Sequence, residues 1–161
     1  MTAHSEVIEA TLESTLESVE KAEELTAQVC SRAGFDEEEQ HRIGMAVHES
    51  VINAVRHGNK NDPRKSVRLE FQVHPDRLEI RIRDEGQGFD LESIPDPLEA
   101  ENLLNVSGRG IFLIRAFVDE FRVRYIQGIG TEVTMVKYRN TGNTLDQGGR
   151  HREHEGKNAP R

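Results

Sequence analysis

Two consecutive runs of the chain, at 67–73 and 78–82, place an apolar residue at every second position. Strict alternation over this length is typical of a β-strand with one buried face, because neighbouring side chains of a strand point to opposite sides of the sheet. The segment between the runs, His74-Pro75-Asp76-Arg77, has the composition of a turn. The two runs therefore predict an antiparallel hairpin whose apolar face must be covered by other elements.

A helix is predicted before this hairpin, over about 16–33. Apolar residues recur there at helical spacing. Ser14 and Glu17 have the spacing of a capping box at its start, and Gly34 is a typical stop signal at its end.

A second helix is predicted to begin at Asp36, which is followed by a glutamate, Glu39, at the capping-box distance. Its apolar face continues to Val55, and the segment 57–59 should end it.

The remaining segments complete the predicted fold. Alternating runs at 6–12, 121–125 and 131–138 predict strands, and 110–118 has a helical pattern. A long irregular stretch, 84–107, separates them, and such stretches are usually functional or mobile. Hairpins with helices segregated to one face predict an α+β fold: a two-layer α/β sandwich with a mixed, mostly antiparallel sheet.

Length and composition fit one domain. The chain has 161 residues, enough for a single core, which we expect over 1–139. The segment 140–161 is almost free of apolar residues, so we expect a disordered polar tail. The single cysteine, Cys30, is expected to be a packed helix residue rather than a nucleophile.

Charge and hydropathy exclude several classes of protein. The formal net charge of −8 argues against direct attachment to nucleic acid, which depends on Lys and Arg. No apolar run approaches the length of a membrane span, and the first ten residues lack the pattern of a secretion signal. A cytoplasmic protein is therefore expected, without a direct nucleic-acid or membrane partner.

The second predicted helix carries a carboxylate, Glu49, and a carboxamide, Asn53, four residues apart and on one side. Such a pair suits the orientation of a nucleophile beside Mg²⁺, which takes oxygen donors. Taken alone, the pair is more simply explained as two solvated residues on a helix flank.

A zinc-protease helix is excluded, because the position four residues after His48 is Ile52.

Two glycine-containing segments follow. Asp84-Glu85-Gly86-Gln87-Gly88 comes directly after a predicted strand, where Asp84 can accept a hydrogen bond from an amine-bearing base; an ordinary strand-exit turn explains the segment equally well. Ser107-Gly108-Arg109-Gly110 precedes a helix, which suits phosphate binding, although Gly-x-Gly alone is weak evidence.

In this order and spacing, the motifs resemble those of the GHKL superfamily of ATP-binding proteins, whose fold is also called the Bergerat fold. Glu49-x-x-x-Asn53 with His57-Gly58 looks like the N box. Asp84-x-Gly86-x-Gly88 looks like the first glycine box, Gly108-Arg109-Gly110 like the second, and Gly130-Thr131 like the final Gly-Thr element.

Within the superfamily, the closest resemblance is to anti-sigma factor serine/threonine kinases, over about 6–139. The phrases HESVINAVRHGN, RDEGQGFD, SGRGIFLIRAFVDEF and GTEVTM carry it. It implies ATP and Mg²⁺ as cofactors, with Glu49 as catalytic base and Asn53 as metal ligand. The other residues that would bind nucleotide are Asp84, Gly86, Gly88, Gly108, Arg109, Gly110 and Thr131. His57, more simply a helix residue, is a further candidate for a phosphate contact, because donors accumulate at a helix end.

The resemblance also implies partners. Members of this group are usually homodimers that sequester a sigma factor and phosphorylate an anti-anti-sigma protein of the STAS type. Three alternatives stay open from the sequence. They are a non-catalytic ATP-binding module of the same fold, the catalytic domain of a sensor histidine kinase, and an α/β domain whose glycine turns are structural.

Overall fold

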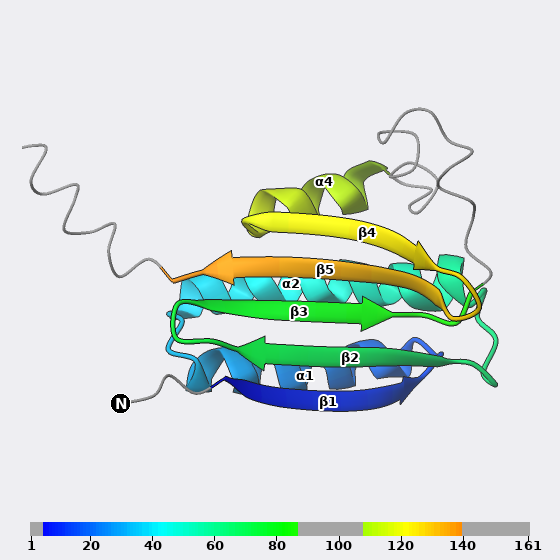
Figure 1. Ribbon diagram of the computed structural model, residues 1–161, viewed down its shortest axis with the longest axis horizontal. Helices are drawn as coiled ribbons and strands as arrows, with labels where there is room; N and C mark the ends of the chain where they lie inside the picture. The colour runs from blue at the N-terminus through cyan, green and yellow to red at the C-terminus, as the bar shows by residue number, and fades with distance from the viewer. Residues whose placement is uncertain (1–4, 87–107, 140–161) are drawn as a thin grey trace, which may run out of the picture.

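The computed structural model describes residues 5–86 and 108–139 (Figure 1). Five strands form one sheet in the order β1-β2-β3-β5-β4, and all pairings among them are antiparallel. The strands are β1 (Glu6–Glu13), β2 (Ser66–Val73), β3 (Arg77–Arg83), β4 (Glu120–Ile126) and β5 (Gly130–Tyr138). The hairpins predicted from alternation are therefore confirmed, and the first strand lies at an edge of the sheet.

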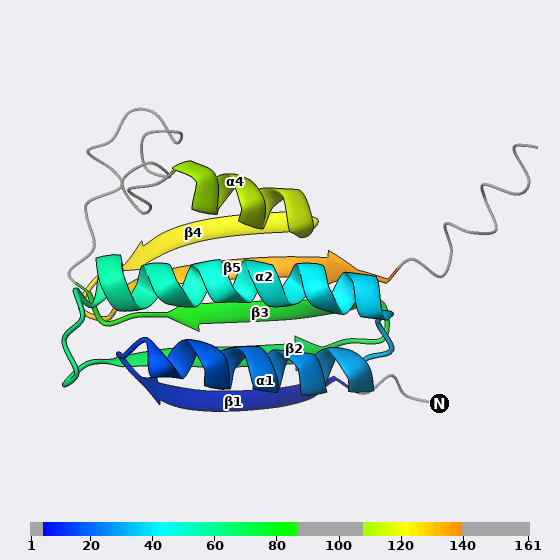
Figure 2. The same cartoon turned by 180° about the vertical axis from the view of Figure 1, so that it is seen from behind.

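The helices cover one face of this sheet, as Figure 2 shows. They are α1 (Glu17–Arg32), α2 (Glu37–Asn53) and α4 (Gly108–Phe117), and α2 packs against both of the others. The predicted two-layer α/β sandwich with helices on one face is confirmed. Within the described ranges, no helix is long and apolar enough to span a membrane. The expected tail, 140–161, lies outside the described residues.

The core forms where the apolar faces of sheet and helices meet. Most of the alternating residues of β2 and β3 point inward and are almost fully buried, as are Ile43, Ala46, Val47 and Val51 of α2. They include Leu69, Phe71, Ile80, Ile82, Ile43 and Val47. Burying each side chain of this size contributes about 1.5–3 kcal/mol, so the contact between the sheet and α2 is a major source of the fold's stability.

The N-terminal cap predicted from the sequence is present in α2 but not in α1. Asp36 caps α2, and its Oδ1 accepts a hydrogen bond from the Glu39 N–H at 2.8 Å, as predicted. The predicted capping box of α1 is wrong. Ser18 Oγ donates to the Glu13 carbonyl at 2.6 Å, while the buried Ser14 Oγ has no hydrogen-bond partner among the described residues.

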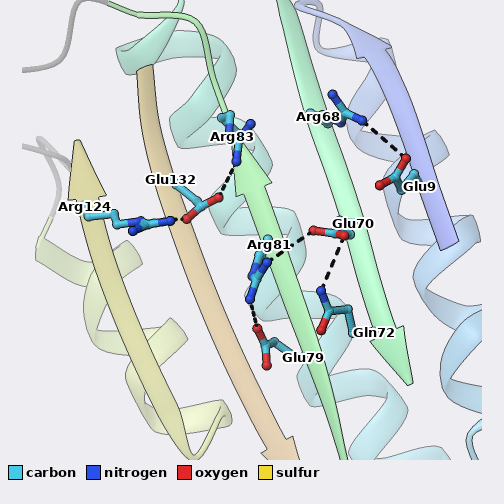
Figure 3. Close-up of polar contacts among 9 residues, drawn as sticks. All are labelled: Glu9, Arg68, Glu70, Gln72, Glu79, Arg81, Arg83, Arg124 and Glu132. Carbon is cyan, nitrogen blue, oxygen red and sulfur yellow. Dashed lines mark hydrogen bonds and ion pairs between the residues drawn. The ribbon is translucent and has the colours of Figure 1, made fainter. Parts of the chain in front are cut away.

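The opposite face of the sheet carries rows of glutamates and arginines, shown in Figure 3. These side chains come from the outward positions of β1 to β5 and pair across the strands, for example Arg68 with Glu9 at 3.3 Å. This face is covered with charged side chains, and ion pairs between neighbouring strands offset their charges. The layout explains why one layer of helices is sufficient for the sheet.

Candidate nucleotide site

Asp84 follows β3 directly and is buried, with 5% of its surface exposed. Its Oδ1 accepts hydrogen bonds from the N–H of Gly86 at 2.9 Å and from the N–H of Thr131 at 3.1 Å. Its own N–H donates to the Thr131 carbonyl at 3.0 Å. Asp84 and Thr131, predicted to act on one ligand, are thus brought into direct contact although they lie far apart in the sequence.

Three glycines close around this pair: Gly58, Gly86 and Gly130. A β-carbon on Gly58 would lie 2.0 Å from Asp84 Oδ2, one on Gly86 would lie 2.1 Å from the Gly58 carbonyl oxygen, and one on Gly130 would lie 1.9 Å from the Asp84 carbonyl oxygen. All three distances are shorter than any real contact. Only glycine fits at these positions. We call the five residues the Asp84 cluster.

The pKa of Asp84 and the hydrogen bonds to its two carboxylate oxygens bear on its role as an acceptor. Burial raises the pKa of its carboxyl, and the backbone hydrogen bonds from Gly86 and Thr131 oppose that rise in part. Both of these bonds go to Oδ1, and none from the described residues goes to Oδ2. Oδ2 therefore keeps the capacity to accept a hydrogen bond from a donor such as an aromatic amine.

Glu49 and Asn53 lie one helical turn apart at the end of α2, and both are half-buried. Asn53 is the last residue of α2 and is followed by a π-helical turn, η1 (Ala54–Gly58). The α-helix thus ends before the expected stop at 57–59 and continues as this wider turn, a feature often found at functional sites. Because η1 ends at Gly58, the same turn delivers a glycine to the Asp84 cluster.

The elements of the predicted site have their ends on the same side of the molecule. The end of α2 with η1, the end of β3, the start of β5 and the first turn of α4 all lie there, at the left in Figure 2. Gly108, Arg109 and Gly110 form the first turn of α4, where backbone N–H groups have no partner within the helix. His57 is exposed on η1, and Gly88 lies outside the described residues.

Asn59 is a structural residue of the site that sequence reasoning missed. It is 1% exposed, its Oδ1 accepts from the Glu85 N–H at 2.7 Å, and its Nδ2 donates to the Ser66 carbonyl at 3.0 Å. It therefore ties the segment after η1 to the exit of β3 and the start of β2. The available signal was an asparagine directly after the His57-Gly58 motif, a type that readily bonds to backbone.

A hollow of about 360 Å³ lies beside Asp84 on the other side of the sheet end. Its lining includes Thr11, Arg68, Arg83 and Ile129, but neither Glu49 nor Asn53. Asp84 and Glu85 also line this hollow, so it borders the Asp84 cluster.

Comparison with known protein families gives one match over most of the chain. The family described as "Histidine kinase-like ATPase domain" matches residues 12–137. This range contains Glu49, Asn53, the Asp84 cluster and the first turn of α4.

Comparison with curated proteins gives relatives named "Serine-protein kinase RsbW". The one from Listeria innocua is 32% identical over 118 residues, covering 70% of this chain and 74% of its own. The one from Bacillus subtilis is 35% identical over 118 residues (70% and 72%), and the one from Staphylococcus epidermidis 35% over 147 residues (86% and 90%). The resemblance to kinases of this group is confirmed.

Comparison with solved structures supports the fold. A crystal structure of the RsbU and RsbW domains of Rv1364c from Mycobacterium tuberculosis aligns with a TM-score of 0.61 at 20% identity. The alignment covers 82% of this chain but only 31% of that chain, so this chain corresponds to less than a third of it. At this identity, the likeness concerns the fold alone.

Proposed function

Because the chain belongs to the histidine kinase-like ATPase family, we propose that it transfers the γ-phosphoryl group of ATP to a serine or threonine of a partner protein, with Mg²⁺ as cofactor. Family and relatives establish ATP binding and the protein kinase class. The observation that carries the proposal for this chain is the Asp84 cluster, a buried acceptor ringed by glycines next to the helix end that bears Glu49 and Asn53.

The base of ATP is assigned to the Asp84 cluster. Asp84 Oδ2 would accept a hydrogen bond from the 6-amino group of adenine, and Thr131 would support that contact from β5. Gly86, which cannot carry a β-carbon here, lets the flat base approach the backbone, and Gly88 is proposed to do the same.

The phosphates are assigned to the first turn of α4. Gly108, Arg109 and Gly110 would close on them, since a helix start offers free N–H groups and a favourable dipole. His57 on η1 is proposed as a further phosphate contact. The match between these donors and an anion is independent of the adenine contact, which makes the two assignments separately testable.

The residues present fit a magnesium ion. Asn53 offers a carboxamide oxygen, half-buried at the end of α2, and Mg²⁺ takes oxygen ligands while keeping several waters. Asn53 would hold the ion. When bound, the ion neutralises charge on the phosphates.

Glu49 is assigned as the base. In the proposed step, the partner's hydroxyl oxygen forms a bond to the γ-phosphorus, the bond from that phosphorus to the β,γ-bridging oxygen breaks, and ADP leaves. Glu49 orients the hydroxyl and takes its proton. Catalysis of this type depends on positioning, so a base on the rigid end of α2 is well placed.

The proposed partners follow from the kinases this chain resembles. We infer a sigma factor that the protein sequesters, an anti-anti-sigma protein of the STAS type that it phosphorylates, and a homodimer as the working form. The non-catalytic alternative shares the nucleotide site and differs only in lacking transfer.

The deciding experiment is transfer of label from γ-³²P-ATP to a purified candidate anti-anti-sigma protein. Glu49→Ala should keep ATP affinity and lose transfer, because Glu49 acts on the hydroxyl rather than on the nucleotide. Glu38→Ala, at the exposed start of the same helix, is the matched control and should transfer normally. Label transfer by Glu49→Ala at the wild-type rate would reject the assigned base.

A further inference from the structure

Glu132 of β5 joins three strands on the face of the sheet opposite the helices (Figure 3). Its Oε2 accepts a hydrogen bond from Arg83 Nη2 on β3 at 2.8 Å, and its Oε1 accepts one from Arg124 Nε on β4 at 2.9 Å. The Glu132 side chain is only 3% exposed. A carboxylate so far removed from water is stable only when paired, and here each of its oxygens has an arginine.

This cross-link lies directly behind the Asp84–Thr131 contact. Arg83 and Glu132 are partners in the β3–β5 register, and their chain neighbours are Asp84 and Thr131. Because successive residues of a strand face opposite sides, the ion pair and the proposed adenine contact share one stretch of backbone. A shift of that backbone would move both.

The shared stretch is also the end of the β3–β5 ladder. β3 ends at Arg83 and β5 begins at Gly130, whose backbone lies against the Asp84 carbonyl. Strand ends open more readily than strand centres. The double link of Glu132 holds β3 and β4 to β5 at this point, and so fixes the spacing on which the 3.1 Å bond from Thr131 N to Asp84 Oδ1 depends.

We propose that Glu132 is a positioning residue for the nucleotide site: by fastening β3 and β4 to β5, it holds the Asp84 carboxylate where it accepts the 6-amino group of adenine, and it thereby sharpens selection of adenine over other purines. The proposal rests on the adenine role proposed for Asp84. Glu132 itself lies on the far face and touches no nucleotide.

Glu132→Gln tests this directly. The variant keeps the shape of the side chain but leaves two guanidinium groups facing a neutral amide, so their repulsion should loosen this end of the sheet. The measurement is the ratio of affinities for ATP and for inosine triphosphate, which carries an oxygen in place of the 6-amino group. We expect this ratio to fall about three- to tenfold, as for a misaligned charge-assisted hydrogen bond.

Glu79→Gln is the matched control. Glu79 is a buried glutamate (8% exposed) on the same face, pairs with Arg81 at 2.6 Å, and lies toward the other end of β3 (Figure 3). The Glu79→Gln variant should lose about as much free energy of unfolding as Glu132→Gln. It should keep the wild-type ratio of ATP to inosine triphosphate affinity. The comparison separates a positioning role from general weakening of the sheet.

A compensating variant tests the mechanism. In Glu132→Gln combined with Arg124→Gln, one of the two opposing cations is gone, and Arg124 is 69% exposed, so its own loss is mild. The double variant should recover part of the lost selectivity, because the repulsion is relieved while the link to β4 stays absent. If Glu132→Gln cannot be purified folded, Arg124→Gln alone should lower the ratio about twofold, since it removes one of the two cross-links.

The outcomes are distinguishable. The proposal is overturned if folded Glu132→Gln, or Arg124→Gln used in its place, keeps the wild-type ratio of ATP to inosine triphosphate affinity. It is also overturned if this ratio falls equally in Glu79→Gln. Failure of the proposed function would look different: wild-type protein would show no heat with MgATP, or Asp84→Asn would keep the wild-type ratio.

Discussion

The carboxylate of Asp84 occupies the space that a side chain on Gly58 would need: a β-carbon there would lie 2.0 Å from Asp84 Oδ2 and 3.0 Å from Asp84 Cβ. Two segments from different parts of the chain, the end of η1 and the exit of β3, thus interlock at a single point. Asp84 cannot simply swing away, because both Gly86 N–H and Thr131 N–H hold its Oδ1.

Gly58→Ala should therefore damage both folding and binding. We expect the free energy of unfolding to fall by about 1–3 kcal/mol, as for other overpacked sites, and ATP affinity to fall with it because Asp84 is displaced. Urea unfolding and calorimetric titration with MgATP measure the two effects. Gly44→Ala is the control, since nothing lies within 4 Å of its β-carbon position on α2. It should stabilise by about 0.5–1 kcal/mol and leave binding unchanged.

Asp84→Asn should separate binding from stability. The amide oxygen of asparagine can still accept from Gly86 and Thr131, but its NH₂ group would face the 6-amino group of adenine, donor against donor. We expect ATP affinity to fall at least about tenfold, the loss typical of a hydrogen bond to a charged group. The free energy of unfolding at pH 7 should stay equal or rise, because the variant buries no charge. A large loss of stability with unchanged affinity would contradict the assigned role.

The fold was predictable because its signals are local. Alternation at 67–73 and 78–82 defined the central hairpin, and a single residue, Asp36, capped α2 as its spacing indicated. The cap predicted at Ser14 was wrong and the one at Asp36 was right, because capping depends on the backbone conformation at that one position. The chain instead makes a tight turn after β1, with Thr15 N–H bonded to the Glu13 carbonyl, and α1 begins later.

The site was predictable only in part, because much of it depends on contacts between distant segments. Glu49, Asn53 and Asp84 belong to motifs, and their order pointed to one ligand. Asn59 and Glu132 lie within the phrases HESVINAVRHGN and GTEVTM, but the resemblance assigns no ligand role to either position. Their roles come from partners far along the chain, Glu85 in one case and Arg83 in the other, and no local period encodes these pairings.

Cys30 should be chemically silent in the folded protein. It is fully buried in α1, and burial, with a smaller effect from the Glu39 carboxylate, raises the pKa of its thiol to about 12. Only the thiolate is nucleophilic, so an aromatic disulfide reagent at pH 8 should react no faster than the protein unfolds. The same sample in guanidinium chloride should react completely within minutes. Rapid reaction without denaturant would show that this part of the core opens.

Asp84 and Glu132 should give opposite stability changes when neutralised. Burial raises the pKa of Asp84, so its charge destabilises the folded state at neutral pH, and this cost disappears as pH falls towards the unfolded value of about 4. For Glu132, burial alone would raise the pKa, but hydrogen bonds from Arg83 and Arg124 outweigh it and lower the pKa. Its charge therefore stabilises the fold above the unfolded value, and that gain is lost as pH falls through the lowered folded value.

Urea unfolding of wild type, Asp84→Asn and Glu132→Gln across this range checks both signs. At pH 7, Glu132→Gln should be less stable than wild type and Asp84→Asn should not be. With falling pH, the extra stability of Asp84→Asn over wild type should vanish first, because it changes in the pH range above the unfolded carboxyl pKa of about 4. The lower stability of Glu132→Gln relative to wild type should begin to recover only below about pH 4.3. A Glu132→Gln deficit that shrinks already between pH 7 and 5 would mean that the two arginines do not hold the pKa of Glu132 down.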